Sequence, residues 1–154
     1  MVMLRIKRTD SSDKDFQQLV RELDADLLLR NGDEQTFYSQ FNKIDMIKFA
    51  VVAYAGDIPV GCGAIKAFSA DAMEVKRMFV QIPSRGKGVA RAILTELEQW
   101  AHELNYKKCV LETGTRQLEA MGMYESGGYL RIPNYAQYEG LAHSLCCEKV
   151  LNGG

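Results

Sequence analysis

A short segment with two glycines and several basic residues is the part of this sequence best suited to bind an anion. It reads Arg85-Gly86-Lys87-Gly88-Val89-Ala90 and is followed by Arg91. The apolar residues from position 89 onward recur at helical spacing, so a helix is expected to begin here. The first N–H groups of such a helix are unpaired and lie at the positive end of its dipole. Glycines let the backbone approach a ligand closely, and the segment therefore predicts a turn that binds phosphate.

Other interpretations of these six residues remain open. Two glycines before a helix can simply form a turn. A Walker A loop would need Ser or Thr after Gly86-Lys87, where this sequence has Gly88. A dinucleotide-binding fold would need a third glycine at Arg91 and a parallel strand–helix–strand unit before the turn. Both nucleotide motifs fit poorly, so the choice between a bare turn and an anion site depends on the surrounding elements.

Those elements predict a mixed α/β fold. Helical spacing predicts helices over about 13–29, 89–104 and 116–126, while residues 33–45 form either a loop or a short helix. Alternating or valine-rich runs predict strands near 4–6, 49–54, 58–68, 73–80, 109–111, 129–132 and 144–150. Short turns join the strands between 49 and 80, which favours antiparallel pairing. The strand–helix–strand order from 73 to 111 favours a right-handed parallel crossover.

Composition narrows the classes of protein that remain. The 154 residues fit one domain, 1–154, and 19 basic against 20 acidic residues give a net charge of −1. A charge this close to zero does not favour nucleic acid or an anionic membrane as a partner. With no signal peptide and no membrane span visible, we expect a cytoplasmic protein. The cysteines at 62, 109, 146 and 147 lack metal-ligand spacing, so we expect reduced, mostly buried thiols and no metal.

The segment from Arg85 to Ala90 and its surroundings resemble GNAT-type N-acetyltransferases. The signature of that family is Gln or Arg, then any two residues, Gly, any one residue, and Gly or Ala, and the six residues of the segment match it. Met78-Phe79-Val80 with Pro83 resembles the fourth strand of that family and its exit, and Leu111-Glu112-Thr113 resembles the fifth strand. Residues 120–129 match the helix motif Ala-x-x-x-Tyr-x-x-x-Gly-aromatic, and residues 131–138 resemble a bacterial subgroup of small members. The resemblance implies a mainly antiparallel sheet of about seven strands with helices on both faces. Strands 4 and 5 would be parallel and would splay around the cofactor.

The resemblance also implies a cofactor, acetyl-CoA, and the residues that hold it. Backbone groups of Met78, Phe79 and Val80 would bind the thioester and pantetheine, and Gln117 stands where many relatives carry an asparagine that contacts the cofactor. Tyr124 matches the tyrosine that protonates the departing thiolate, although spacing alone would make it an aromatic residue of the helix–sheet interface. The pyrophosphate would be bound by backbone N–H groups of Arg85, Gly86, Lys87, Gly88, Val89 and Ala90.

Direct acetyl transfer to an amine also needs a base, because a free alkyl amine with a pKa near 10.4 arrives mostly protonated. Glu74 is the first candidate, with a solvated strand residue as the alternative, and Glu112 is the second. Aromatic clustering suggests that Phe37, Tyr38 and Tyr135 line the acceptor side together with Glu112.

We therefore expect an N-acetyltransferase acting on a primary amine of a small molecule or peptide, and a homodimer is plausible from the resemblance. The alternatives are a non-catalytic CoA-binding regulatory module and an acyltransferase for another donor or acceptor.

Overall fold

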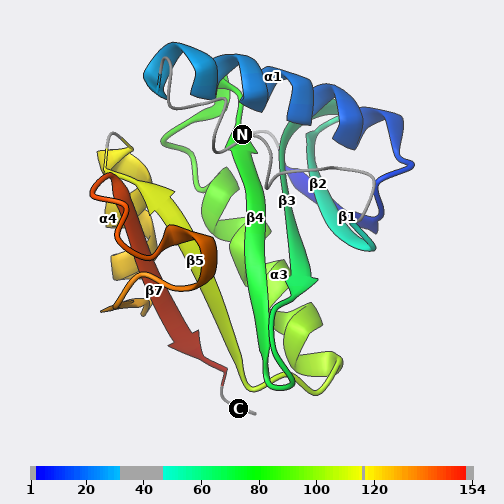
Figure 1. Ribbon diagram of the computed structural model, residues 1–154. Helices are drawn as coiled ribbons and strands as arrows, with labels where there is room; N and C mark the ends of the chain where they lie inside the picture. Colours follow the sequence, from blue (N-terminus) through cyan, green and yellow to red (C-terminus); the bar gives the residue numbers. More distant parts are fainter. Residues whose placement is uncertain (1–2, 32–46, 116, 152–154) are drawn as a thin grey trace.

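The computed structural model describes residues 3–31, 47–115 and 117–151, which form one mixed sheet with helices on both faces (Figure 1). The strands are β1 (Leu4–Thr9), β2 (Phe49–Ala55), β3 (Ile58–Ala67), β4 (Ala72–Val80), β5 (Lys108–Gly114), β6 (Leu130–Ile132) and β7 (Ser144–Val150). The α-helices are α1 (Lys14–Asn31), α3 (Val89–Glu103) and α4 (Leu118–Ser126), and two short 3-10 helices are η3 (Ile82–Ser84) and η4 (Ala136–Tyr138). The strand order is β1-β2-β3-β4-β5-β7-β6.

These elements confirm the predicted fold class. The strands and the three α-helices lie where the hydrophobic patterns placed them, and the predicted cap chemistry before the first helix is present. The Asp13 carboxylate accepts a hydrogen bond from the Phe16 N–H at 2.9 Å, which satisfies one free donor of the first turn. β4 and β5 are parallel, as expected for strands joined by a crossover helix, and all other neighbours are antiparallel.

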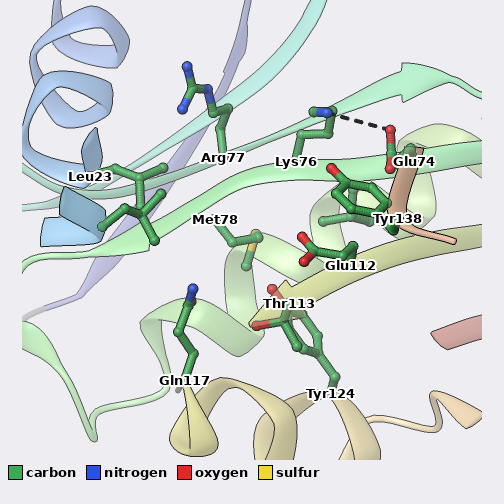
Figure 2. A pocket seen from close by; sticks show the side chains of 12 residues that line it. Leu23, Glu74, Lys76, Arg77, Met78, Glu112, Thr113, Gln117, Tyr124 and Tyr138 are labelled. Atoms are coloured by element: carbon green, nitrogen blue, oxygen red, sulfur yellow. Dashed lines mark ion pairs between the residues drawn. The ribbon is translucent and has the colours of Figure 1, made fainter. Parts of the chain in front are cut away.

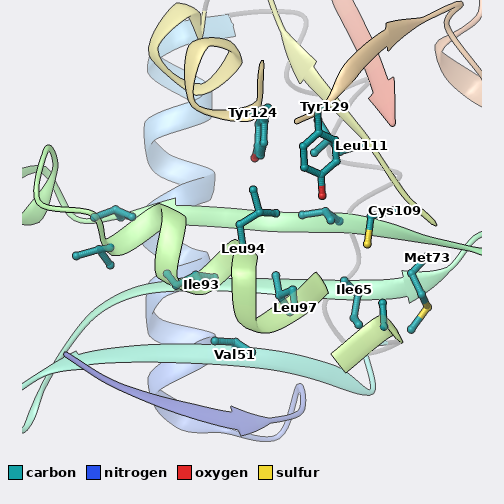
Figure 3. Packing of buried hydrophobic residues seen from close by; sticks show 14 of the residues in the cluster. Val51, Ile65, Met73, Ile93, Leu94, Leu97, Cys109, Leu111, Tyr124 and Tyr129 are labelled. Atoms are coloured by element: carbon teal, nitrogen blue, oxygen red, sulfur yellow. The ribbon is translucent and has the colours of Figure 1, made fainter. Parts of the chain in front are cut away.

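Side chains that alternate along the central strands build a separate core on each face of the sheet. On β2, Val51 and Ala53 pack with α3, whereas Ala50, Val52 and Tyr54 pack with α1. The α3 face is the larger core, and its fully buried members include Ile93, Leu94 and Leu97 (Figure 3). Because apolar side chains cover both faces, the sheet is a rigid platform for whatever its strand ends carry.

The parallel pairing of β4 with β5 is short. It runs from Ala72 opposite Lys108 to Val75 opposite Leu111, after which the two strands diverge towards their C-terminal ends (Figure 1). A β-bulge follows immediately on β4, where Arg77 and Met78 together oppose Gly63 of β3. Arg77 has a left-handed backbone with φ 61°, and its carbonyl accepts a hydrogen bond from the buried Cys62 thiol at 3.3 Å.

The bulge reverses the side-chain alternation of β4. Met73 and Val75 belong to the core on the α3 face, but Phe79 belongs to the core on the α1 face. In a regular strand these three odd-numbered residues would share one face. The bulge thus turns Met78 and Val80 to the α3 side of the sheet, beyond the last residue pair that β4 forms with β5.

Gly63 is the residue of β3 that gives the bulge room. A Cβ at this position would lie 2.5 Å from the Met78 sulfur, 2.8 Å from Ile93 Cγ2 and 2.9 Å from Leu97 Cδ1. Real Cβ atoms do not come so close to neighbouring atoms, so a side chain here would have to push the Met78 side chain away from the sheet.

We predict that Gly63→Ala lowers the free energy of unfolding by about 1–3 kcal/mol, because the added methyl overpacks the core beneath the bulge. Urea denaturation followed by circular dichroism measures this change. Gly122→Ala on α4 is the matched control, since its Cβ meets nothing within 4 Å. The control should leave stability unchanged or raise it by up to about 1 kcal/mol, as expected in a helix. Equal stability of the two variants would contradict the proposed packing role of Gly63.

Candidate active site

The divergence of β4 and β5 opens a cavity of about 520 Å³. Its walls are the end of β4, the turn at 84–88, the first turn of α3 and the facing side of α4. Met78, Phe79 and Val80 line it from the strand, and Gln117, Ala120, Met123 and Tyr124 line it from α4. The strand end, the glycine turn and the tyrosine helix, which are distant in the sequence, therefore enclose one space.

The glycine turn has the geometry of an anion site. Gly86 has φ 77° and Gly88 has φ 84°, backbone conformations that favour glycine over other residues. Gly88 is the N-cap of α3, and no side chain within the described residues caps this helix start. The first turn of α3 also contains no acidic residue. Its N–H groups and the helix dipole can therefore act on a ligand in the cavity.

The basic side chains of this turn point in different directions. Arg85 folds back on β4, where its Nε donates to the Val80 carbonyl at 2.7 Å and its guanidinium lies 3.8 Å from the Asp26 carboxylate. Arg91 crosses to α4, where it donates to the Met123 carbonyl at 3.0 Å. Lys87 is exposed. The two arginines thus fix the walls of the cavity, while Lys87 extends from the turn itself.

A second, smaller cavity of about 100 Å³ adjoins the first on the β5 side (Figure 2). It is lined by Glu74, Lys76 and Arg77 of β4, by Glu112 and Thr113 of β5, and by Tyr138 of η4. Leu23, Met78, Gln117 and Tyr124 line both cavities. The molecule therefore has two adjoining compartments, one at the glycine turn and one lined by carboxylates, with Tyr124 where they meet.

Among the carboxyl groups of the two cavities, that of Glu112 has the pKa that departs most clearly from its ordinary value. Burial raises its pKa to about 7, and the nearby Glu74 carboxylate acts in the same direction. A hydrogen bond with Ser144 and the charge of Lys76 oppose the change. A carboxyl group with a pKa near neutrality can accept and release protons at physiological pH.

Glu74 is buried, with 8% of its surface exposed, so the alternative of a solvated strand residue is wrong. Its carboxylate accepts a hydrogen bond from the Tyr135 hydroxyl at 2.7 Å and lies 3.6 Å from the Lys76 ammonium. Tyr135 in turn packs edge-on against Phe68 at 4.7 Å and against Tyr138 at 5.7 Å. Glu74 is thus held by a hydrogen bond and an ion pair at the edge of the smaller cavity.

Tyr124 combines a packing role with a place in both cavities. Its ring lies 5.8 Å from that of Tyr129 in an edge-on contact and belongs to the core on the α3 face. In Figure 2 the side chain projects from α4 towards Thr113 and Glu112 at the end of β5. Burial raises its pKa above the usual value, so the phenol keeps its proton throughout the physiological range.

The structure gathers most of the predicted site residues at these two cavities. Glu112 lines the smaller one, and Gln117 lies at the N-cap of α4 beside both. Tyr135 packs against the Tyr138 ring and contacts the site through its hydrogen bond to the Glu74 carboxylate. The predicted acceptor residues Phe37 and Tyr38 lie outside the described residues.

Sequence reasoning missed the contribution of α1. Leu23 and Leu27 line the smaller cavity, yet their spacing marks them only as core residues of an amphipathic helix. Thr113 was also missed, although it directly follows Glu112 at the end of a predicted strand.

Comparisons with known proteins identify the family. A model of the GNAT acetyltransferase family matches residues 16–129. The chain is 33% identical over 138 residues to an IAA acetyltransferase of Azospirillum brasilense, covering 87% of this chain and 89% of the relative. Other N-acetyltransferases match over shorter stretches, and the chain spans 34–64% of the length of three of them.

Solved structures agree with this assignment. A Klebsiella pneumoniae structure assigned to the acyl-CoA N-acyltransferases superposes with a TM-score of 0.81 at 25% identity, covering 97% of this chain and 99% of that one. PaiA N-acetyltransferase of Thermoplasma acidophilum, solved in complex with coenzyme A, shares the fold with a TM-score of 0.72 at 13% identity, covering 96% and 99% of the two chains.

This chain belongs to the GNAT family of acetyltransferases and is an acyltransferase. Within the described residues, no helix is long and apolar enough to cross a bilayer.

We predict that Glu112→Gln stabilises the protein in a pH-dependent manner. The folded-state pKa of about 7 lies above the ordinary 4.5, so ionisation opposes folding once the pH exceeds 4.5. The gain of the variant should be absent near pH 4, grow between pH 4.5 and 7 by about 1.4 kcal/mol per pH unit, and then level off at about 3 kcal/mol. Urea denaturation at pH 5 and pH 8 measures it. A gain that is the same at both pH values would show that Glu112 titrates normally.

Proposed function

We propose that this protein transfers an acetyl group directly from acetyl-CoA to a primary amine of a small molecule or peptide. The observation that carries the proposal is the pair of adjoining cavities that meet at Tyr124. In this proposal the larger cavity takes the cofactor and the smaller cavity takes the amine.

The residues around the larger cavity fit acetyl-CoA. The uncapped start of α3 and the two left-handed glycines suit the pyrophosphate, and Lys87 adds charge beside them. Backbone groups of Met78, Phe79 and Val80 lie where β5 has left β4, so they can pair with an extended pantetheine arm. Acetyl-CoA supplies an activated acetyl thioester whose thiol leaving group has a pKa near 8.5, by analogy with cysteine.

Glu112 is the better placed of the two candidate bases. Its raised pKa of about 7 makes it a stronger base than an ordinary carboxylate, while a large fraction is still ionised at neutral pH. An alkyl ammonium in the smaller cavity can give its proton to Glu112, directly or through water. Glu74 is engaged by Tyr135 and Lys76 and is better suited to hold the acceptor.

Tyr124 is assigned the role of general acid. Its phenol is protonated at neutral pH and lies at the junction of the cavities, where it can return a proton to the departing thiolate. Backbone N–H groups of β4 beyond the bulge are available to stabilise negative charge on the carbonyl oxygen. Because a thiol already leaves readily, the loss of Tyr124 should slow turnover without abolishing it.

We predict that Gly88→Ala raises the Kd of coenzyme A by about tenfold, because a side chain strains the left-handed N-cap and displaces the N–H groups that face the cavity. Isothermal titration calorimetry with coenzyme A measures the change. Gly56→Ala in the β2–β3 turn is the matched control, with φ 63° and, like Gly88, no atom within 4 Å of its Cβ. Both variants should lose similar stability, but only Gly88→Ala should lose affinity. Unchanged affinity in Gly88→Ala would remove the turn from the cofactor site.

We predict that Glu112→Gln lowers kcat/KM by about 100-fold or more, the usual contribution of a general base. Thiol release from acetyl-CoA with a panel of alkylamines, arylalkylamines, diamines and peptide amines measures it. In the wild type, protonation of Glu112 should lower kcat/KM by a factor of about ten per pH unit below about pH 7, in addition to any loss from protonation of the amine. Glu112→Gln should lack this acidic limb of the pH profile.

Glu74→Gln serves as the comparison for this test. It should chiefly raise the KM for the amine and keep the pH limb. Loss of the limb in Glu74→Gln and its retention in Glu112→Gln would reverse the assignment. No thiol release with any amine of the panel would count against the proposed acceptor class as a whole.

A further inference from the structure

The Arg91 side chain links the two helices that enclose the larger cavity. Arg91 lies in the first turn of α3, and its Nη2 donates to the Met123 carbonyl at 3.0 Å and to the Ser126 hydroxyl at 2.6 Å. The Ser126 hydroxyl also donates to the Met123 carbonyl at 3.0 Å. A guanidinium at the C-terminal end of a helix interacts favourably with free carbonyls and with the helix dipole. Arg91 therefore caps α4 from α3.

Gly127 accommodates this contact. It is the C-cap of α4, and a Cβ built on it would overlap the Arg91 Nη1 atom. The first glycine of the Gly127-Gly128 pair has an ordinary φ, so the backbone alone does not require glycine there. Its lack of a side chain leaves the space that the Arg91 guanidinium occupies. Arg91, Ser126 and Gly127 together form one structural unit, which we call the α3–α4 clamp.

The clamp joins the glycine turn to α4, which carries the proposed general acid Tyr124. The backbone of Arg91 lies three residues after Gly88, at the start of α3, while the carbonyl that it holds belongs to Met123, the residue before Tyr124. Both helices line the cavity, so the bond links the first turn of α3 to the part of α4 that carries Tyr124. A shift of about 1 Å in a catalytic group can cost a large factor in rate.

We propose that Arg91 is a positioning residue, which acts on turnover by holding α4 and hence Tyr124. This inference rests on the proposed function of Tyr124. The competing role for a cation at this helix start is direct binding of cofactor phosphates. The two roles differ in what they require, because phosphate binding needs only a positive charge, whereas the clamp needs a guanidinium long enough for its Nη2 to reach both Met123 and Ser126.

Four variants separate these roles. Arg91→Ala removes the clamp and the charge, Arg91→Lys keeps the charge on a shorter side chain without the guanidinium, and Gly127→Ala keeps Arg91 but displaces it from α4. Arg21→Gln is the control for losing an arginine, because among the described residues the Arg21 guanidinium donates to Gln18 within α1 and is far from the clamp residues in the sequence. We expect kcat for thiol release from acetyl-CoA, with the fastest amine of the panel, to fall roughly tenfold in the first three variants. The KM for acetyl-CoA should change by less than about threefold, and the control should behave as wild type.

A double-mutant cycle tests the dependence on Tyr124. Arg91→Ala should cost little further kcat in a Tyr124→Phe background, because the group that the clamp positions has already been removed. A full additional loss in that background would overturn the proposal. So would rescue by Arg91→Lys, or a loss confined to the KM for acetyl-CoA that deepens as salt is lowered, since each indicates a phosphate ligand.

Hydrogen exchange of the α4 amides gives a readout that does not depend on the chemistry. Exchange should speed up in α4 but not in α1 for both Arg91→Ala and Gly127→Ala. Unchanged α4 exchange would overturn the clamp even if activity fell. Faster exchange with unchanged kcat would overturn its link to Tyr124. If Tyr124→Phe alone keeps wild-type kcat, the acid role in the proposed function fails, and exchange still decides whether the clamp exists.

Discussion

The site depends on the early end of the hydrogen bonding between β4 and β5. Parallel pairing stops at Val75 and Leu111, and the bulge at Arg77 and Met78 then reverses the side-chain alternation of β4. An exposed strand edge inside a sheet would normally be costly, because its N–H and C=O groups need partners. Here the edge lines a cavity, where an extended ligand can supply those partners. The bulge is stabilised from β3 by Cys62 and from α1 by an ion pair between Arg77 and Asp24 at 2.8 Å.

The two carboxyl groups of the smaller cavity, those of Glu74 and Glu112, differ in their partners. Lys76 lies beside Glu74 at 3.6 Å, and Arg77 is directed to Asp24, so each cation of β4 has an acidic partner. Burial, and after it the Glu74 charge, raises the pKa of Glu112, and a hydrogen bond with Ser144 and the charge of Lys76 oppose this only in part. Glu74 is thereby held by a hydrogen bond and an ion pair, while the raised pKa of Glu112 allows that carboxyl group to exchange protons near neutrality.

Several residues serve the core and the site together. Tyr124 packs on Tyr129 in the core of the α3 face, and Tyr129 in turn donates to the Glu98 carboxylate at 2.9 Å. Leu23 belongs to the core under α1 and also lines both cavities. Substitutions at such positions change stability as well as activity. The contribution of a residue to the reaction is therefore clearest where a change leaves the packing intact, as an amide in place of the Glu112 carboxyl does.

The sequence by itself determined the order and type of the elements, because hydrophobic periodicity and turn chemistry are local properties. It also determined the glycine turn, since Gly86 and Gly88 permit left-handed torsions at the start of an amphipathic helix. The strand order β5-β7-β6, the burial of Glu74 and the raised pKa of Glu112 were decided only by the tertiary structure. The same holds for Arg91, whose charge suggested a phosphate contact but whose side chain reaches α4. Each of these depends on which distant side chains come together, and one-dimensional spacing carries no such information.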